Sequence, residues 1–280
     1  MSRLATRFAE LRAARRAGLV IFVTAGDPHP DRTVELMRAL VAAGADVLEL
    51  GVPFSDPMAD GPVIQRASER ALAHGMDLRR VLELVRAFRQ TDTTTPLVLM
   101  GYLNPIEQMG VERFAAAAAD AGVDGVLTVD LPFDEEPEHA AALRAVGLDS
   151  IFLLAPTSGP ERARAVAARA SGFLYYVSVR GVTGAGQVDM ADVQTQVQAL
   201  KEHIDLPVGV GFGVRTPQAA AQIAGFADAV VVGSAVIEQI EAAAAAGITG
   251  PEALRGAVGL VRALRGGVET RIETAGGEGR

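Results

Sequence analysis

The chain has 280 residues, a formal net charge of −8 and no cysteine. Hydrophobic residues make up 49 % and charged residues 21 %, which is the composition of a folded globular protein and not of a disordered one. No basic stretch is interleaved with aromatic residues, and no apolar run reaches the roughly 18 residues of a membrane span. These features argue against nucleic acid as the main partner and against a membrane-spanning segment, and they exclude disulfides and thiolate catalysis.

The first 18 residues carry several arginines, and Leu4, Phe8 and Leu11 fall on one helical face. A mitochondrial transit peptide can look similar. Because the segment contains Glu10 and leads straight into an apolar run, we expect an ordinary first helix.

Short apolar runs recur after this segment and predict eight strands. They cover residues 19–24, 46–51, 96–101, 125–130, 148–153, 173–178, 207–211 and 229–233. Stretches with helical periodicity lie between them. These cover residues 31–43, 63–73 with 78–88, 111–121, 135–145, 160–170, 190–201, 216–224 and 235–245, and a last one covers 251–264.

Eight strand–helix units in a chain of this length predict an α/β fold, a (β/α)₈ TIM barrel with an extra N-terminal helix and additional helices. We expect residues 1–268 to form one barrel domain and residues 269–280 to be a flexible C-terminal tail. An open, doubly wound sheet is the alternative. It usually carries a G-x-G-x-x-G turn after its first strand, and the segment Ala25-Gly26-Asp27-Pro28 is not one.

The segment from Glu49 to Pro62 carries the strongest functional signal. Glu49 lies inside a predicted strand whose two faces are mostly apolar, where an ionised carboxylate is costly. Burial would raise its pKa, so that it could carry a proton at neutral pH, while Asp60 on the following Pro/Gly-rich loop would ionise more readily. The alternatives are a Glu49 paired with a buried arginine and an Asp60 that only shapes a turn.

Other candidate proton carriers at the predicted strand ends are Tyr102, Tyr175 and Asp130. We expect Asp130 to have a structural role, capping or bracing the site. Lys201 is the single lysine and lies near a helix end, on the wrong side of the seventh strand for a Schiff base in the site. The four histidines are scattered, which argues against a catalytic metal.

Glycines end the seventh and eighth strands and precede helices, a place where barrels often bind phosphate through backbone N–H groups. Gly213, Gly233 and Ser234 are the expected donors, with simple tight turns as the alternative. The glycine-rich loop 179–189 could close as a lid, with Thr183 and Gly184 touching substrate, or could be a passive connection. The apolar residues expected near the mouth of the barrel, which suggest a flat hydrophobic substrate, are Phe22, Met100, Leu127, Leu153, Tyr175 and Phe212.

Taken together, these segments resemble the α subunit of tryptophan synthase over about residues 15–265. The stretches that carry the resemblance are Glu49–Pro62, Met100-Gly-Tyr-Leu-Asn-Pro105, Asp130-Leu-Pro, Arg180-Gly-Val-Thr-Gly184, Gly211-Phe-Gly and Gly233-Ser234. The resemblance implies a lyase that cleaves indole-3-glycerol phosphate to indole and glyceraldehyde 3-phosphate in tryptophan biosynthesis, without a metal or a Schiff base. It also implies a cytoplasmic enzyme.

The resemblance also implies a role for each matching residue. Glu49 would protonate indole C3 and take the proton of the glycerol hydroxyl, Asp60 would hold the indole N–H, and Tyr175 would position Glu49. Thr183 would hold Asp60 once the lid closes. The phosphate site would be formed by Gly184, Gly213, Gly233 and Ser234, and the remaining predicted substrate-binding residues are Phe22, Met100, Tyr102, Leu127 and Phe212.

The implied partner is a β subunit in an α₂β₂ complex, contacted near Pro53–Asp60 and Asn104. The α chain itself would need no cofactor, because pyridoxal phosphate belongs to the β subunit. Two other functions remain open at this point: a different phosphate-binding barrel enzyme, such as a sugar-phosphate isomerase or epimerase, and a catalytically idle subunit that only activates a β-type protein.

Overall fold

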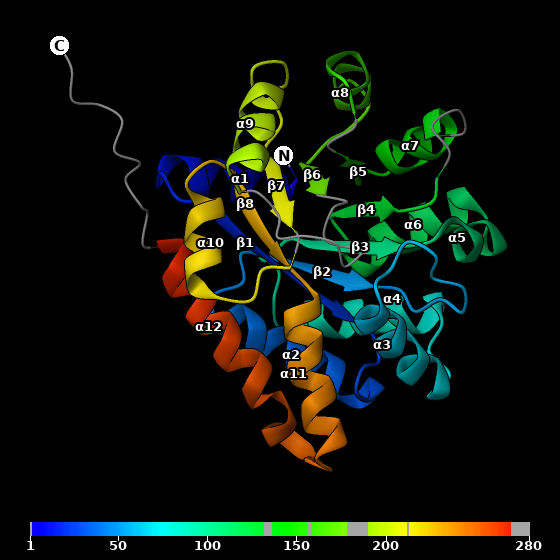
Figure 1. The fold of residues 1–280 in the computed structure, drawn as a ribbon. Coiled ribbons are helices and arrows are strands. Elements are labelled where there is room, and N and C mark those ends of the chain that lie inside the picture. The colour runs from blue at the N-terminus through cyan, green and yellow to red at the C-terminus, as the bar shows by residue number, and fades with distance from the viewer. Residues whose placement is uncertain (1, 132–135, 156–157, 178–189, 212, 270–280) are drawn as a thin grey trace.

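In the computed structural model, eight parallel strands form a closed barrel in the order β1 to β8, and helices surround it (Figure 1). The structure describes residues 2–131, 136–155, 158–177, 190–211 and 213–269. Closure is direct, because β8 pairs with β1 through Gly18↔Ala229 and the three following residue pairs. The predicted TIM barrel is therefore confirmed, and the alternative of an open sheet is wrong.

The strands lie within two residues of their predicted ends. Their bounds are β1 Gly18–Thr24, β2 Val47–Gly51, β3 Leu97–Gly101, β4 Gly125–Thr128, β5 Asp149–Leu154, β6 Leu174–Val177, β7 Val208–Gly211 and β8 Ala229–Val232. The helices on the outside are α1 Arg3–Ala13, α2 Pro30–Ala42, α3 Pro62–Ala73, α4 Leu78–Arg89, α5 Leu103–Met109, α6 Val111–Ala121, α7 Glu136–Ala145, α8 Pro160–Ala167, α9 Met190–Lys201, α10 Pro217–Ala224, α11 Ser234–Ala245 and α12 Arg255–Glu269.

Two helical segments differ from the sequence-based expectation. Helix α5 was not expected, because it is short and its Pro105 suggests a turn; in fact this proline occupies the first turn, where a missing N–H costs little. The predicted helix 251–264 is divided into a 3₁₀ turn, η2 (Gly250–Leu254), and α12. Residues 270–280 lie outside the described residues, so the single domain and the flexible tail stay predictions.

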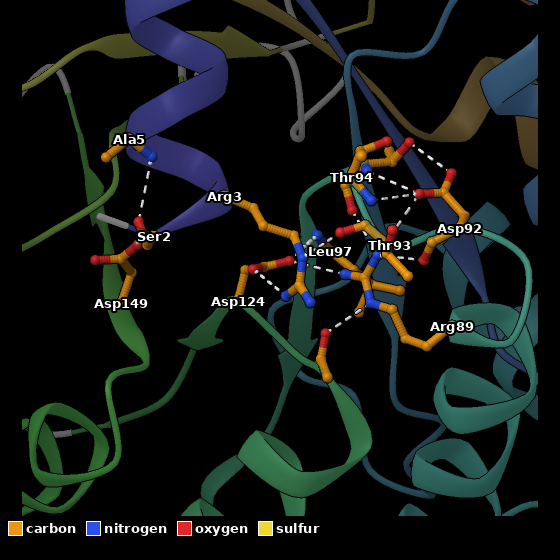
Figure 2. A network of polar contacts seen from close by, with 12 residues as sticks. Ser2, Arg3, Ala5, Arg89, Asp92, Thr93, Thr94, Leu97, Asp124 and Asp149 are labelled. Atoms are coloured by element: carbon orange, nitrogen blue, oxygen red, sulfur yellow. Dashed lines mark hydrogen bonds and ion pairs between the residues drawn. The ribbon is translucent and has the colours of Figure 1, made fainter.

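Helix α1 closes the N-terminal end of the barrel; the sequence predicted the helix and its apolar face but not this position. Leu4, Phe8 and Leu11 are buried in the cluster of inward-pointing strand residues. Polar contacts at the start of the helix fasten it there: Arg3 pairs with Asp124, and the hydroxyl of Ser2 donates to Asp149 at 2.7 Å (Figure 2). The other end of the barrel is thus left as the open one.

Aspartates at the N-terminal strand ends brace the barrel. The carboxylate of Asp124 accepts the backbone N–H of Leu97 at 2.8 Å and pairs with Arg89 at 2.8 Å (Figure 2). Asp46 and Asp228 repeat the arrangement, each accepting the N–H of a neighbouring strand and pairing with a cation. Each carboxylate thus ties a strand, its neighbour and a helix together. The side chains of Asp46 and Asp124 are buried, whereas that of Asp228 is 31 % exposed.

Candidate active site

Glu49 lies on the inner face of β2, opposite Phe22 on β1 and Val98 on β3. Its residue is 1 % exposed, and its Oε1 has no hydrogen-bond partner within the described part of the chain. Burial, and then the negative charge of Asp60, raise the pKa of Glu49 to about 8. The carboxyl group is therefore protonated at neutral pH, and no arginine of the described residues forms an ion pair with it.

Asp60 lies in the loop between β2 and α3, where a backbone turn and a side chain from α3 define the position of its main chain. The N–H of Asp60 donates to the carbonyl of Pro57 at 3.1 Å, and Gln65 donates its amide to the carbonyl of Asp60 at 2.9 Å. Burial raises the pKa of Asp60 to about 6, and a hydrogen bond from Tyr102 opposes that rise. The pKa values of the two carboxyl groups therefore differ in the direction that the sequence predicted, with the lower pKa at Asp60.

Tyr175 lies on the inner face of β6, where burial and the charge of Glu49 raise the pKa of its hydroxyl. Its ring fits only because the neighbouring strand carries Gly211. A Cβ at that position would lie 2.8 Å from the Tyr175 hydroxyl oxygen and 2.9 Å from Cβ of Val231. The sequence analysis named Gly211 in the stretch Gly211-Phe-Gly at the end of the seventh strand, but it did not predict that this glycine makes room for the Tyr175 ring.

A cavity at the C-terminal end of the barrel connects Glu49 and Tyr175 with the glycines of the last two loops. Residues from six strands, two helices and their loops line it: Phe22, Glu49, Ile64, Met100, Tyr175, Gly211, Gly213, Val214, Arg215, Val231, Gly233, Ser234 and Ala235. Helix α11 begins at Ser234, so its first N–H groups are free of helical partners and suit an anion. Gly213 has a φ of +53°, a conformation that favours glycine.

Most of the predicted site residues of the described chain therefore lie together. Four predicted residues do not line the cavity. Asp60 lies in the loop after β2, Leu127 and Leu153 pack in or against the inner cluster, and Tyr102 directs its hydroxyl to the Asp60 loop. Ile64, Val214, Arg215, Val231 and Ala235 line the cavity and were not predicted. Val231 lies on β8, and the places of the other four depend on how α3, α11 and the loop after β7 pack. Thr183, Gly184 and Phe212 lie outside the described residues.

The other polar candidates have structural partners. Asp130 accepts the backbone N–H of Leu103 at 2.7 Å and so caps α5, as expected. Lys201 pairs with Asp228 at the N-terminal end of the barrel, remote from the cavity. In the part of the chain that the structure describes, no three histidine or carboxylate groups come together as a metal site, and no helix is both long and apolar enough to cross a membrane.

Comparison with known proteins agrees with this arrangement. The family model for the tryptophan synthase alpha chain matches residues 8–259. The tryptophan synthase alpha chain of Laribacter hongkongensis is 62 % identical over 245 residues, which are 88 % of this chain and 93 % of the relative. That of Acidithiobacillus ferrooxidans is 59 % identical over 264 residues, 94 % of this chain and 96 % of the relative.

A crystal structure of the tryptophan synthase subunit alpha from Legionella pneumophila superposes with a TM-score of 0.90 at 46 % identity, covering 96 % of this chain and 99 % of the other. The similarity extends over the barrel and over the segments that carry Glu49, Asp60 and the glycine-rich loops. The chain belongs to the tryptophan synthase alpha chain family.

Proposed function

We propose that this chain cleaves indole-3-glycerol phosphate to indole and glyceraldehyde 3-phosphate with Glu49 as its general acid and base. The observation that carries the proposal is a buried carboxyl group with an unpartnered oxygen, facing a cavity whose far side offers free N–H groups at the start of α11. Family membership supports the lyase reaction itself, so the isomerase and idle-subunit alternatives have no observation in their favour.

The chemistry follows from the two protonation states of Glu49. The protonated carboxyl group donates its proton to indole C3, which makes the ring an electron sink. The resulting carboxylate takes the proton of the hydroxyl on the adjacent glycerol carbon, and the electrons of the C–C bond move into the ring. Indole C3 gains one proton and the glycerol hydroxyl loses one. Indole and an aldehyde are therefore released, and Glu49 is protonated again.

Asp60 and Tyr175 support this cycle in different ways. An ionised Asp60 accepts the indole N–H and stabilises the positive charge that develops on the ring when C3 is protonated. Tyr175 lies beside Glu49 and restricts its position. We assign the phosphate to Gly213, Gly233 and Ser234, with Thr183 and Gly184 of loop 179–189 completing the site. No step of this cycle requires pyridoxal phosphate, which in this family belongs to the β subunit.

The pH dependence of kcat/KM is expected to be bell-shaped, with its maximum between about pH 6 and pH 8. Below about pH 6 Asp60 becomes protonated and can no longer stabilise the cationic ring, because its pKa is about 6. Above about pH 8 Glu49 loses the proton that it must donate, because its pKa is about 8. Initial rates of indole release measured from pH 5 to 9 test this, and an activity that still rises above pH 9 would contradict it.

The direct test of the proposed function is an assay of indole formation from indole-3-glycerol phosphate, with this chain alone and with a tryptophan synthase β chain added. We expect slow release of indole alone and faster release with the partner. No indole under either condition would refute the lyase assignment. We further propose an α₂β₂ complex in the cytoplasm, and the mass of the mixture by light scattering tests the stoichiometry.

We place the β chain on the loop that carries Asp60 and on the start of α5 near Asn104. Met58 at the tip of this loop is 94 % exposed, the largest exposure of any large apolar side chain in the described structure. Single exposed apolar side chains are common on protein surfaces, but methionine is enriched in protein interfaces, and Met58 lies in the segment that the family resemblance assigns to the partner.

Replacing Met58 by Asp is therefore expected to raise the dissociation constant for the β chain by about tenfold or more, because a charge would be buried without a partner. Titration calorimetry measures this. Ile248→Asp is the matched control, since Ile248 is also an exposed apolar residue (42 %) but follows α11 at the opposite end of the barrel. Equal effects of the two substitutions would contradict the placement of the partner.

A further inference from the structure

A second cavity lies beside α1 at the closed, N-terminal end of the barrel. It forms where the ends of α1, α9 and α10 meet the segments that precede β1, β7 and β8 (Figure 1). Its volume is about 450 Å³, within the range of about 300–1,000 Å³ that is typical of small-molecule sites. The loop on which we place the β chain lies at the other end of the barrel, so the cavity stays accessible in the proposed complex.

The floor of this cavity is apolar. Phe8 and Leu11 reach it from the buried face of α1, and Ala17 and Ala227 reach it from the segments before β1 and β8. These four residues are at most 8 % exposed, and Phe226 beside them is half-buried. A floor of this kind contacts the carbon skeleton of a ligand and removes it from water.

The rim of the cavity is basic, although the chain as a whole has a net charge of −8. Its charged lining side chains are four cations and one carboxylate: Arg12, Arg15, Arg16, Lys201 and Asp228. Two of the cations are already paired, Arg16 with Asp46 at 2.9 Å and Lys201 with Asp228 at 2.9 Å. Arg12 and Arg15 are exposed, and neither forms an ion pair with a carboxylate of the described residues. Within that part of the chain, two positive charges thus lie without a counter-ion beside an apolar floor.

Arg15 also has an unfavourable backbone conformation. Its φ is +50°, and it is the one residue other than glycine with a positive φ in the described structure. It follows the C-cap of α1 in a Schellman motif, in which its N–H donates to the carbonyl of Arg12 and the next N–H donates to that of Leu11, both at 3.0 Å. Glycine is usual at this position because it has no Cβ to oppose the left-handed conformation. An arginine there costs stability, and a cost of this kind points to a function of the side chain.

We propose that this cavity is a binding site for a small organic anion with an apolar body and a doubly charged group, the class to which aryl phosphates belong. The guanidinium groups of Arg12 and Arg15 bind the charged group, because their forked N–H donors match the oxygens of a phosphate. The apolar floor at Phe8 and Leu11 takes the body of the ligand. A large polyanion fits less well, since the net charge of the chain repels it and the two arginines border a hollow. The site is separate from the lyase site and does not depend on the proposed function.

Titration of the ¹⁵N-labelled chain with phenyl phosphate, followed by amide chemical shifts, tests the proposal. The amides of Gly225 and Ala227 report on this cavity, whereas those of Gly213 and Gly233 report on the candidate active site. We expect saturable shifts at Gly225 and Ala227 with a dissociation constant below about 1 mM. Inorganic phosphate should bind there at least about fivefold more weakly, because it cannot contact the floor. Shifts confined to Gly213 and Gly233 would overturn the proposal, and equal binding of the two anions would overturn the class of ligand.

Arg15→Gly separates a ligand-binding role from a structural one. Glycine relieves the left-handed conformation, so the midpoint of thermal unfolding should rise by about 1–2 °C. The same variant loses one of the two guanidinium groups, so its dissociation constant for phenyl phosphate, measured at Gly225 and Ala227, should rise about tenfold. A stabilised variant with weakened binding is thus the expected combination. Wild-type affinity in Arg15→Gly would contradict the assignment.

Arg12→Gln is the second variant, and it covers the case in which Arg15→Gly alters the end of α1. It should also weaken the binding of phenyl phosphate about tenfold. Arg144→Gln is its matched control, because Arg144 is likewise an exposed arginine in the last turn of a helix, α7, and does not line the cavity. The control should bind phenyl phosphate like the wild type. Equal weakening by the two substitutions would show that only the overall charge matters, and the site would have to be abandoned.

Discussion

Replacement of Glu49 by Gln is expected to lower kcat for indole release by about 10³-fold, with substrate binding nearly unchanged. The amide has the size of the carboxyl group but can neither give a proton to C3 nor take one from the hydroxyl. Steady-state assays with and without the β chain measure kcat, and titration with indole-3-glycerol phosphate under non-turnover conditions measures binding. A variant with near-normal turnover would exclude Glu49 as the proton carrier.

Two further measurements make this test specific. Glu83→Gln, at an exposed position of α4, is the control and should be fully active. The free energy of unfolding gives an independent readout, because the pKa of Glu49 is raised in the folded chain. The contribution of Glu49 to the free energy of unfolding is fully present at low pH and is lost as the pH rises towards about 8. The free energy of unfolding of the wild type should therefore fall over that range relative to that of Glu49→Gln.

Replacement of Asp124 by Ala is expected to destabilise the barrel by about 3–5 kcal/mol. The side chains of Asp124 and Arg89 are 4 % and 9 % exposed. The substitution leaves the buried guanidinium with only the more distant Asp92 carboxylate, at 3.9 Å, and leaves the N–H of Leu97 without its acceptor. Arg3 of α1 loses its partner as well (Figure 2). Urea unfolding followed by circular dichroism gives the midpoint and the slope from which the free energy is obtained.

The matched control is Asp120→Ala, which breaks an arginine–aspartate pair of similar length on the surface. Asp120 is 76 % exposed and lies 3.0 Å from Arg86, so its loss should cost at most about 0.5 kcal/mol. Similar losses in the two variants would show that burial of the Asp124 network contributes nothing, and the bracing role of the N-terminal aspartates would have to be abandoned.

The order of strands and helices could be predicted from the sequence because it depends on neighbours along the chain. Apolar runs of strand length and helical periodicity are local properties, and eight repetitions leave few folds other than a barrel. The same holds for Glu49, whose burial follows from the apolar residues on both faces of its own strand. Its raised pKa was thus predictable before any contact was known.

The functions of side chains that join distant segments could not be predicted in this way. Tyr102 was expected to touch substrate, but its hydroxyl binds residues 43 positions earlier in the chain. The turn-like aspartates at the N-terminal strand ends brace neighbouring strands, and Gly211 is required by a tyrosine 36 residues away. Helix α5 was not predicted, because its sequence is short and contains residues typical of a loop, such as Asn104 and Pro105.

By itself, then, the sequence determined the barrel, the first helix that closes it, and the buried carboxyl group together with the more acidic one beside it. Tertiary structure alone decided which groups meet at the mouth, what holds Asp60, and how the closed end is braced. The physical reason is that hydrophobic periodicity acts within one element, whereas a hydrogen bond or a steric fit between elements exists only after the barrel has closed.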